Sequence, residues 1–104
     1  QGKLDEATYE QRRQHARQAQ TEAQRLKLDE RLEGFTKQLE NAMAALARRL
    51  HAAQAELRAG RVPETLRMLK DAAKVEKRNV ELAKTMRDLQ TAASALLRRE
   101  ARAA

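Results

Sequence analysis

The sequence predicts an all-α protein, an antiparallel helical hairpin of coiled-coil type whose first helix overhangs the second. Apolar residues recur at alternating steps of three and four along two long segments, and the sole proline lies close to a glycine between them. Such steps place side chains on one face of a helix. Only 2% of the residues are aromatic and 36% are charged, so we expect a narrow apolar seam within one domain, 1–104.

The first helix is expected from Asp5 to Ala59. Its apolar stripe comprises Leu28, Leu32, Phe35, Leu39, Ala42 and Leu46. The next step, from Leu46 to Leu50, is four where three is due, which locally unwinds a supercoil. Gly34 leaves open a break into three helices, since glycine costs a helix interior about 1 kcal/mol relative to alanine. The unbroken phase of the stripe favours a continuous helix.

The stretch ELRAGRVPETL, from Glu56 to Leu66, marks the tip of the hairpin. Gly60 suits the left-handed conformation that closes a helix, and Pro63 suits the first turn of the next one. We therefore divide the domain into an overhang (1–22), a first arm (23–59), a turn (60–62), a second arm (63–99) and a tail (100–104).

The second helix is expected from Pro63 to about Arg99. Its stripe comprises Met68, Ala72, Val75, Asn79, Leu82, Met86, Leu89, Ala93 and Leu96, with steps of four and three throughout. Folding at the tip pairs residues whose numbers sum to about 121. The seam between the arms is expected to consist of Leu32, Phe35, Leu39, Leu46, Val75, Asn79, Leu82, Met86 and Leu89. Asn79 either fixes the register from within the seam or lies at its wet margin.

The overhang is rich in glutamine and in good helix formers, but in this register it has no partner within the chain. We expect it to be helical only with support, because isolated helices are marginal in water. The chain begins with Gln1 and not with methionine, which leaves open a fragment of a longer protein.

The residue inventory argues against an enzyme. The chain has no cysteine, two histidines, one tyrosine and no glycine-rich loop. His15 and His51 are far apart in the hairpin, and the carboxylates alternate with basic residues at the spacing of helical ion pairs. We expect no catalytic residues, no metal site and no cofactor.

The net charge of +7 favours acidic partners. Arginine clusters suit phosphate, because the guanidinium group presents several donors in one plane. The candidate nucleic-acid contacts are Arg12, Arg13, Arg17, Arg48, Arg49, Arg58, Arg61, Arg98, Arg99 and Arg102. Two aromatic residues cannot build a stacking platform, so any contact is expected with the backbone. The alternative is a solvated basic flank with acidic partners one helical turn away.

A seam this narrow gains much from a second copy, so we expect a homo-oligomer. No run of apolar residues is long enough to cross a membrane, and the first residues do not form a signal peptide. A cytoplasmic location is therefore expected.

The second arm, above all VELAKTMRDLQTAASALL, resembles the helical oligomerisation region of phage small terminase subunits. This resemblance covers about a third of the chain and implies assembly beside a DNA-binding domain. In form alone, the chain is also similar to the arginine- and glutamine-rich two-helix stalks that insert into export ATPase rings, which are longer.

Three function hypotheses follow. The first, to which we commit, is a non-enzymatic oligomerisation module of a nucleic-acid-associated protein, such as one for phage DNA packaging, with sequence-independent phosphate contacts. The second is an adaptor or stalk that binds a partner protein. The third is a structural coiled-coil spacer.

Overall fold

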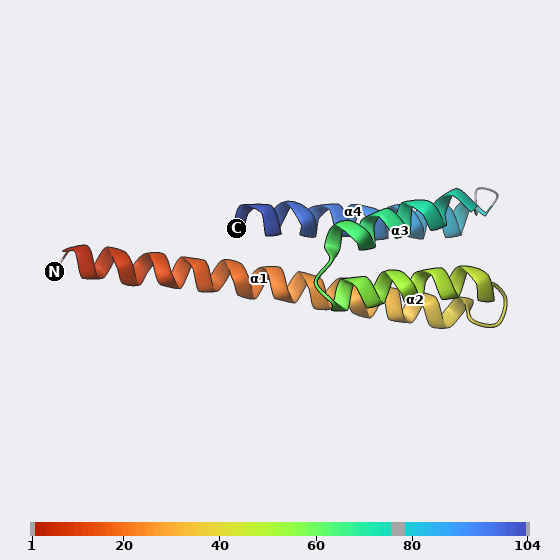
Figure 1. Cartoon of the computed structure of the whole chain (residues 1–104), viewed down its shortest axis with the longest axis horizontal. Helices are drawn as coiled ribbons and strands as arrows, with labels where there is room; N and C mark the ends of the chain where they lie inside the picture. Colours follow the sequence, from red (N-terminus) through yellow and green to blue (C-terminus); the bar gives the residue numbers. More distant parts are fainter. Residues whose placement is uncertain (1, 76–78, 104) are drawn as a thin grey trace.

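The computed structural model describes residues 2–75 and 79–103, and within them the side chains of 6–74 and 79–102. It contains four helices in this part of the chain: α1 (Gly2–Leu39), α2 (Ala44–Arg58), α3 (Val62–Val75) and α4 (Val80–Ala103). Successive helices run in opposite directions (Figure 1). The predicted all-α class is confirmed.

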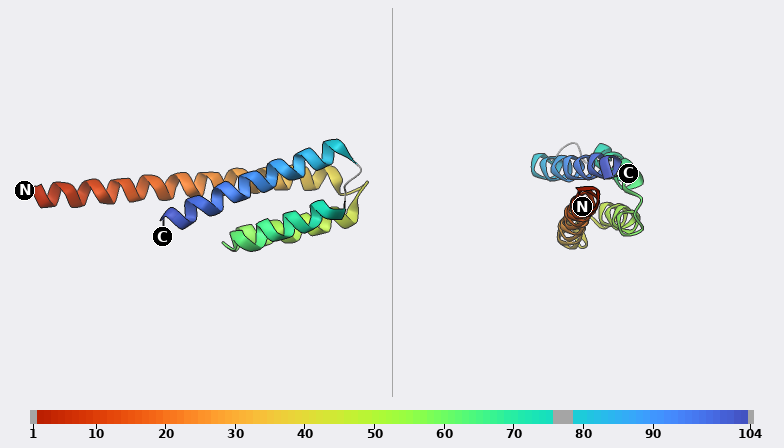
Figure 2. Two further views of the ribbon diagram at one scale, coloured as in Figure 1. Left: turned by 90° about the horizontal axis from the view of Figure 1, so that it is seen from above. Right: turned by 90° about the vertical axis from the view of Figure 1, so that its left-hand side faces the viewer.

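The four helices form an elongated bundle that measures 63 × 20 × 19 Å. Each helix packs against two others, because α1 contacts α2 and α4, and α3 contacts the same two helices. The view along the long axis shows this arrangement (Figure 2). The expectation of one helix from Asp5 to Ala59 is wrong, since α1 ends at Leu39. The second expected helix is also divided, because α3 ends at Val75 and α4 begins at Val80.

The width of the apolar face of α2 explains why the predicted first arm (23–59) folds back on itself into α1 and α2. The buried residues of this short helix are Leu46, Ala47, Leu50, Ala53, Gln54 and Leu57. This face is wider than the seam of a two-helix coiled coil, and burying it takes two neighbouring helices. The four-residue step from Leu46 to Leu50, where three was due, is the feature of the sequence that reflects this wider face. Gly34 does not break the chain and lies within α1.

The turn predicted at Gly60 is present. Gly60 has a φ of 83°, in the left-handed region. Its N–H donates to the carbonyl of Leu57 at 3.1 Å, and the N–H of Arg61 donates to the carbonyl of Glu56 at 2.9 Å. This pair of bonds is the Schellman motif, which satisfies the last carbonyls of α2 and reverses the chain into α3.

The core contains most of the expected seam. Leu32, Leu46, Leu82, Met86 and Leu89 are buried, and Phe35 and Leu39 are partly buried against them. The side chain of Val75 lies outside the described residues.

In α3 the buried position is Leu69, which is 0% exposed, whereas the expected Met68 is only partly buried. The two positions differ by 100° around the helix. The true core face of α3 therefore follows Val62, Thr65, Leu69 and Ala72, all buried.

Asn79 is not a seam residue. It is exposed and directly precedes α4, where its Oδ1 accepts a hydrogen bond from the backbone N–H of Leu82 at 3.1 Å. This is the geometry of a helix N-cap. The side chain that was expected to fix the register of the seam is thus an N-cap. Asn79 lies at heptad spacing because the spacing of the α4 stripe continues across the start of that helix.

The helices differ in length, so the bundle thins towards the N-terminus of α1. All four lie together near the start of α2, only α1 and α4 continue beyond the Gly60 turn, and α1 alone extends past the end of α4 (Figure 1). Residues 6–20 are all exposed. We call this projecting part of α1 the arm, which is distinct from the first and second arms of the predicted hairpin.

Candidate functional site

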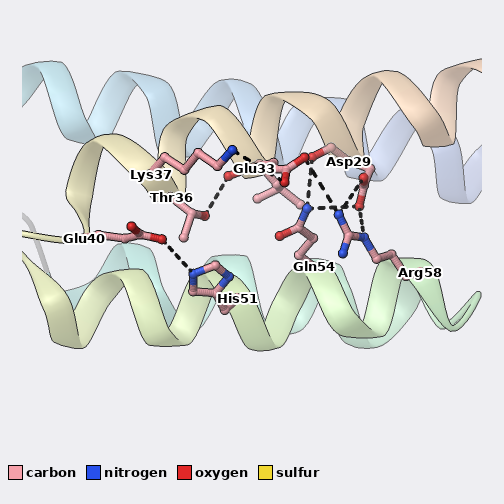
Figure 3. A network of polar contacts seen from close by, with 9 residues as sticks. Asp29, Glu33, Thr36, Lys37, Glu40, His51, Gln54 and Arg58 are labelled. Carbon is pink, nitrogen blue, oxygen red and sulfur yellow. Dashed lines mark hydrogen bonds and ion pairs between the residues drawn. The ribbon is translucent and has the colours of Figure 1, made fainter.

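A polar network joins α1 to α2 on the outside of the bundle (Figure 3). Arg58 donates from Nε to Asp29 Oδ1 at 2.8 Å and from its Nη2 to Oδ2 at 3.2 Å. The buried Gln54 donates to the same Oδ1 at 3.2 Å. Two parallel bonds of this kind are the strong, directional form of an arginine–carboxylate pair. Arg58 therefore has a structural partner on α1.

The electrostatics of Asp29 follow from this contact. The hydrogen bond from Arg58 holds the pKa of the Asp29 carboxyl below its ordinary value of 3.8, and burial opposes this shift only in part. The carboxylate stays charged whenever the bundle is folded near neutral pH. It thus balances one of the arginines that the sequence suggested as a nucleic-acid contact.

The other arginines near the Gly60 turn are also paired. Arg61 bonds to Glu56, and Arg67 bonds to Glu64 at 2.6 Å. Arg67 also lies 3.6 Å from Asp71. Arg58, Arg61 and Arg67, the arginines near this turn, are therefore each paired with a carboxylate.

The open end of the bundle is different. A hollow of about 440 Å³ lies between α1 and α4 and is lined by Arg17, Thr21, Arg99 and Arg102. Arg99 donates from Nη1 to Gln20 Oε1 at 3.1 Å, which links the two helices. No carboxylate is among the described side chains that line this α1–α4 hollow. Of these described lining residues, three carry a guanidinium group, one carries a hydroxyl and none carries a negative charge.

A second basic hollow, of about 370 Å³, lies between α3 and α4. It is lined by Lys70, Arg87, Gln90, Thr91, Ser94 and Arg98. Four of its α4 residues recur at steps of four, three and four and so form one polar stripe: Arg87, Thr91, Ser94 and Arg98. All of these side chains can donate hydrogen bonds, and none of the described lining residues is acidic.

A smaller hollow, of about 170 Å³, opens between α1 and α4 nearer the core. Its lining residues are Gln24, Lys27, Leu28, Arg31, Ala92 and Ala95. Lys27 and Arg31 extend the basic character of the α1–α4 side towards the bundle. Together the three hollows place basic side chains on both sides of α4, and none of their described lining residues is acidic.

The ten predicted arginines are therefore divided among five places. Arg17, Arg99 and Arg102 meet in the α1–α4 hollow, and Arg98 lies in the α3–α4 hollow. Arg58 and Arg61 are paired with carboxylates.

The remaining four lie outside these groups. Arg12 and Arg13 lie on the exposed arm, where Arg13 is 3.5 Å from Glu10 and 5.9 Å above the ring of Tyr9. Arg48 and Arg49 are exposed near the start of α2, at the opposite end of that helix from Arg58. They do not form a cluster with the tip arginines.

Sequence reasoning missed the polar members of these hollows. Thr21 and Gln20 lie on α1, and Arg87, Thr91 and Ser94 form a stripe along α4 that leads to the predicted Arg98. The stripe was readable as a helical repeat of polar residues without an acid, in parallel with the apolar stripe on the other face.

Within the described residues, no three histidine or acidic side chains lie close enough to hold a metal ion. None of the described helices is long and apolar enough to cross a membrane.

No family model, no curated protein and no solved structure matches this chain. The likeness of the second arm to the oligomerisation region of phage small terminase subunits stays a prediction.

Proposed function

We propose that this chain is a non-enzymatic helical assembly module of a nucleic-acid-associated protein, and that α4 and the neighbouring part of α1 contact the phosphate backbone. The observation that carries this proposal is the α1–α4 hollow, where Arg17, Arg99 and Arg102 gather without a carboxylate. Guanidinium groups bind phosphate through two parallel hydrogen bonds, and such contacts supply most sequence-independent affinity for nucleic acids.

The distribution of ion pairs supports this assignment of the surface. Arg58, Arg61 and Arg67 each pair with a carboxylate, of Asp29, Glu56 and Glu64 respectively. Along α4, by contrast, the described stripe of Arg87, Thr91, Ser94 and Arg98 lines a hollow without an acidic lining residue, and its hydroxyls add donors for phosphate oxygens. Because the only aromatic residues are Tyr9 and Phe35, recognition by base stacking is not expected.

The test is a salt titration of binding to short fluorescent duplexes of two unrelated sequences, followed by anisotropy from roughly 50 to 200 mM salt. The double variant Arg99→Gln/Arg102→Gln should bind both duplexes more weakly and lower the slope of log affinity against log salt by about two, because each lost phosphate contact lowers it by about one.

The matched control is Arg48→Gln/Arg49→Gln, which removes the same charge from exposed positions of α2. It should leave the slope nearly unchanged. Equal losses in both double variants would mean that only the net charge matters, and the hollow would lose its role. A wild-type chain that binds neither duplex at the lowest salt concentration would overturn the proposal as a whole.

A second candidate function is that of a protein-binding adaptor. The observation that favours it is the arm, which carries Tyr9 at 62% exposure and continues to Leu26 at 50% exposure. A helix that exposes large apolar side chains in this way suits docking into a partner's groove. Indifference to nucleic acid in the titration would favour this candidate.

A further inference from the structure

The link between α1 and α2 is unusually compatible with a straight helix. It consists of Glu40, Asn41, Ala42 and Met43, and contains neither glycine nor proline. Three of these residues are good helix formers, and asparagine is only moderately unfavourable. Glu40, Asn41 and Ala42 are exposed, so they contribute little to the core.

The backbone of this link already carries helical bonds at both ends. The N–H of Met43 donates to the carbonyl of Leu39 at 2.8 Å, and the N–H of Ala47 donates to the carbonyl of Met43 at 3.0 Å. Both join residues four apart, as in an α-helix. Only a few dihedral angles between Leu39 and Met43 therefore separate the bent form from a continuous helix.

The start of α2 is poorly terminated. Its cap position is Met43, which makes no side-chain hydrogen bond to the helix. The first N–H groups of a helix lack partners within it and are normally served by a serine, threonine, aspartate or asparagine. In a continuous helix, the N–H groups of Ala44, Ala45 and Leu46 would bond to the carbonyls of the link. The Gly60 turn, by contrast, is closed by a complete Schellman motif.

The apolar stripe also passes through the link without losing phase. Leu39, Ala42 and Leu46 continue the steps of three and four that begin at Leu28. A straight helix over α1 and α2 would keep one continuous apolar face. It would also withdraw Leu28 and Leu32, both buried, from their own bundle.

We propose that two copies of this chain exchange α1 through straightening of residues 40–43. In the exchanged dimer, α1 and α2 of each copy form one helix, and α1 packs against α2 and α4 of the other copy. Every contact that α1 makes within the bundle, including the bonds from Gln54 and Arg58 to Asp29, is then remade between copies. The two forms differ only at the link, and such exchange is a low-cost route to dimers.

The occupant of the vacated site is thus α1 of a second copy, because α1 already matches the shape and charges of this site within the bundle. This proposal specifies how the self-assembly in the proposed function takes place, and it does not depend on phosphate binding. All measurements below are made without nucleic acid, so a failure of exchange and a failure of phosphate binding are distinguishable.

The first experiment measures molecular mass by light scattering over a range of concentrations, for the full chain and two link variants. Ala42→Gly disfavours the straight helix roughly fivefold per link, and should weaken dimerisation by roughly 25-fold because two links straighten. Asn41→Ala favours it and should strengthen dimerisation by up to about tenfold. A chain that stays monomeric at all concentrations, even with Asn41→Ala, would overturn the proposal.

The second experiment distinguishes exchange from association of closed bundles. Because the chain has no cysteine, Glu30→Cys and Ala55→Cys introduce the only two sites for spin labels. Both positions are exposed and lie beside the Asp29–Gln54 contact. In the closed form they are on adjacent helices, whose axes lie about 8–10 Å apart. On one straight helix they are 25 residues apart, which corresponds to about 38 Å.

The distance is measured by pulsed electron paramagnetic resonance in the dimer fraction, with labelled chains diluted in unlabelled ones so that only distances within a chain are seen. We expect a population near 38 Å. A dimer that shows only the short distance is an association of closed bundles, and would refute the exchange.

Discussion

The placement of Leu69 and Met68 allows a direct test of the bundle. Leu69 is 0% exposed, whereas its neighbour Met68 is only partly buried against the core. Replacing a fully buried leucine by alanine removes its transfer free energy and leaves a cavity, which together cost about 2–5 kcal/mol. Leu69→Ala should therefore lower the free energy of unfolding by about 3 kcal/mol, and Met68→Ala by about 1 kcal/mol.

These losses are large compared with the total. A domain of this size has a free energy of unfolding of about 5–15 kcal/mol. At about 4–8 °C per kcal/mol, Leu69→Ala should lower the Tm by at least about 12 °C, and Met68→Ala by about 4–8 °C. The assay is thermal and urea unfolding followed by circular dichroism at the helical minimum.

Arg48→Ala, at an exposed position of α2, is the matched control and should change the free energy of unfolding by less than about 0.5 kcal/mol. The apolar stripe expected for the second helix contains Met68 and not Leu69. A larger loss for Met68→Ala than for Leu69→Ala, or equal losses, would refute the core described here and would favour that stripe.

Two further predictions concern the glycines and the α1–α2 network. Gly34→Ala should raise the free energy of unfolding by about 0.5–1 kcal/mol, because Gly34 is helical and an added Cβ meets nothing within 4 Å. Gly60→Ala should lower the free energy of unfolding by about 1–2 kcal/mol, because Gly60 has a φ of 83°. Urea unfolding measures both changes, and a stabilising Gly60→Ala would contradict the turn. Since the folded-state pKa of Asp29 is lowered below 3.8, its charge stabilises the fold above that pH and this contribution is lost as the pH falls through the folded value. Asp29→Asn should therefore be less stable than wild type at pH 7, and the difference should shrink in acid; a gap that is constant with pH would contradict the role of the charge.

Local features of the fold were predictable from the sequence. Gly60 and Pro63 mark a turn through backbone preferences that hold in any surroundings, and the structure has the turn at that position. Leu32 and Leu89 were identified as core because a strong helical repeat leaves few other faces to bury.

The number of helices was not predictable in the same way. Glu40 to Met43 contains no helix breaker, so local preference favours a continuous helix, and the bend depends on the burial of α2 on two sides. Likewise, Met68 and Leu69 are both apolar and adjacent, and only the packing of α3 against two neighbours decides between them.

The site was predictable in part for a similar reason. Arg99 and Gln20 are far apart in sequence, yet their numbers sum to 119, close to the value expected for opposed arms. This register brings Arg17 near the end of α4. The pairing of Arg58 with Asp29 could not be foreseen, because it depends on α1 lying beside α2.

The arm gives α1 two kinds of backbone stability within one continuous helix. Near Leu28 and Leu32, amide hydrogens are protected from exchange with solvent by the whole bundle, and they open only when the bundle opens. Residues 6–16 are exposed and precede the positions where Arg17 and Gln20 meet α4, so these turns melt and re-form by fraying from the end. Cleavage of the arm by a protease would therefore report local fraying and would say nothing about unfolding of the core.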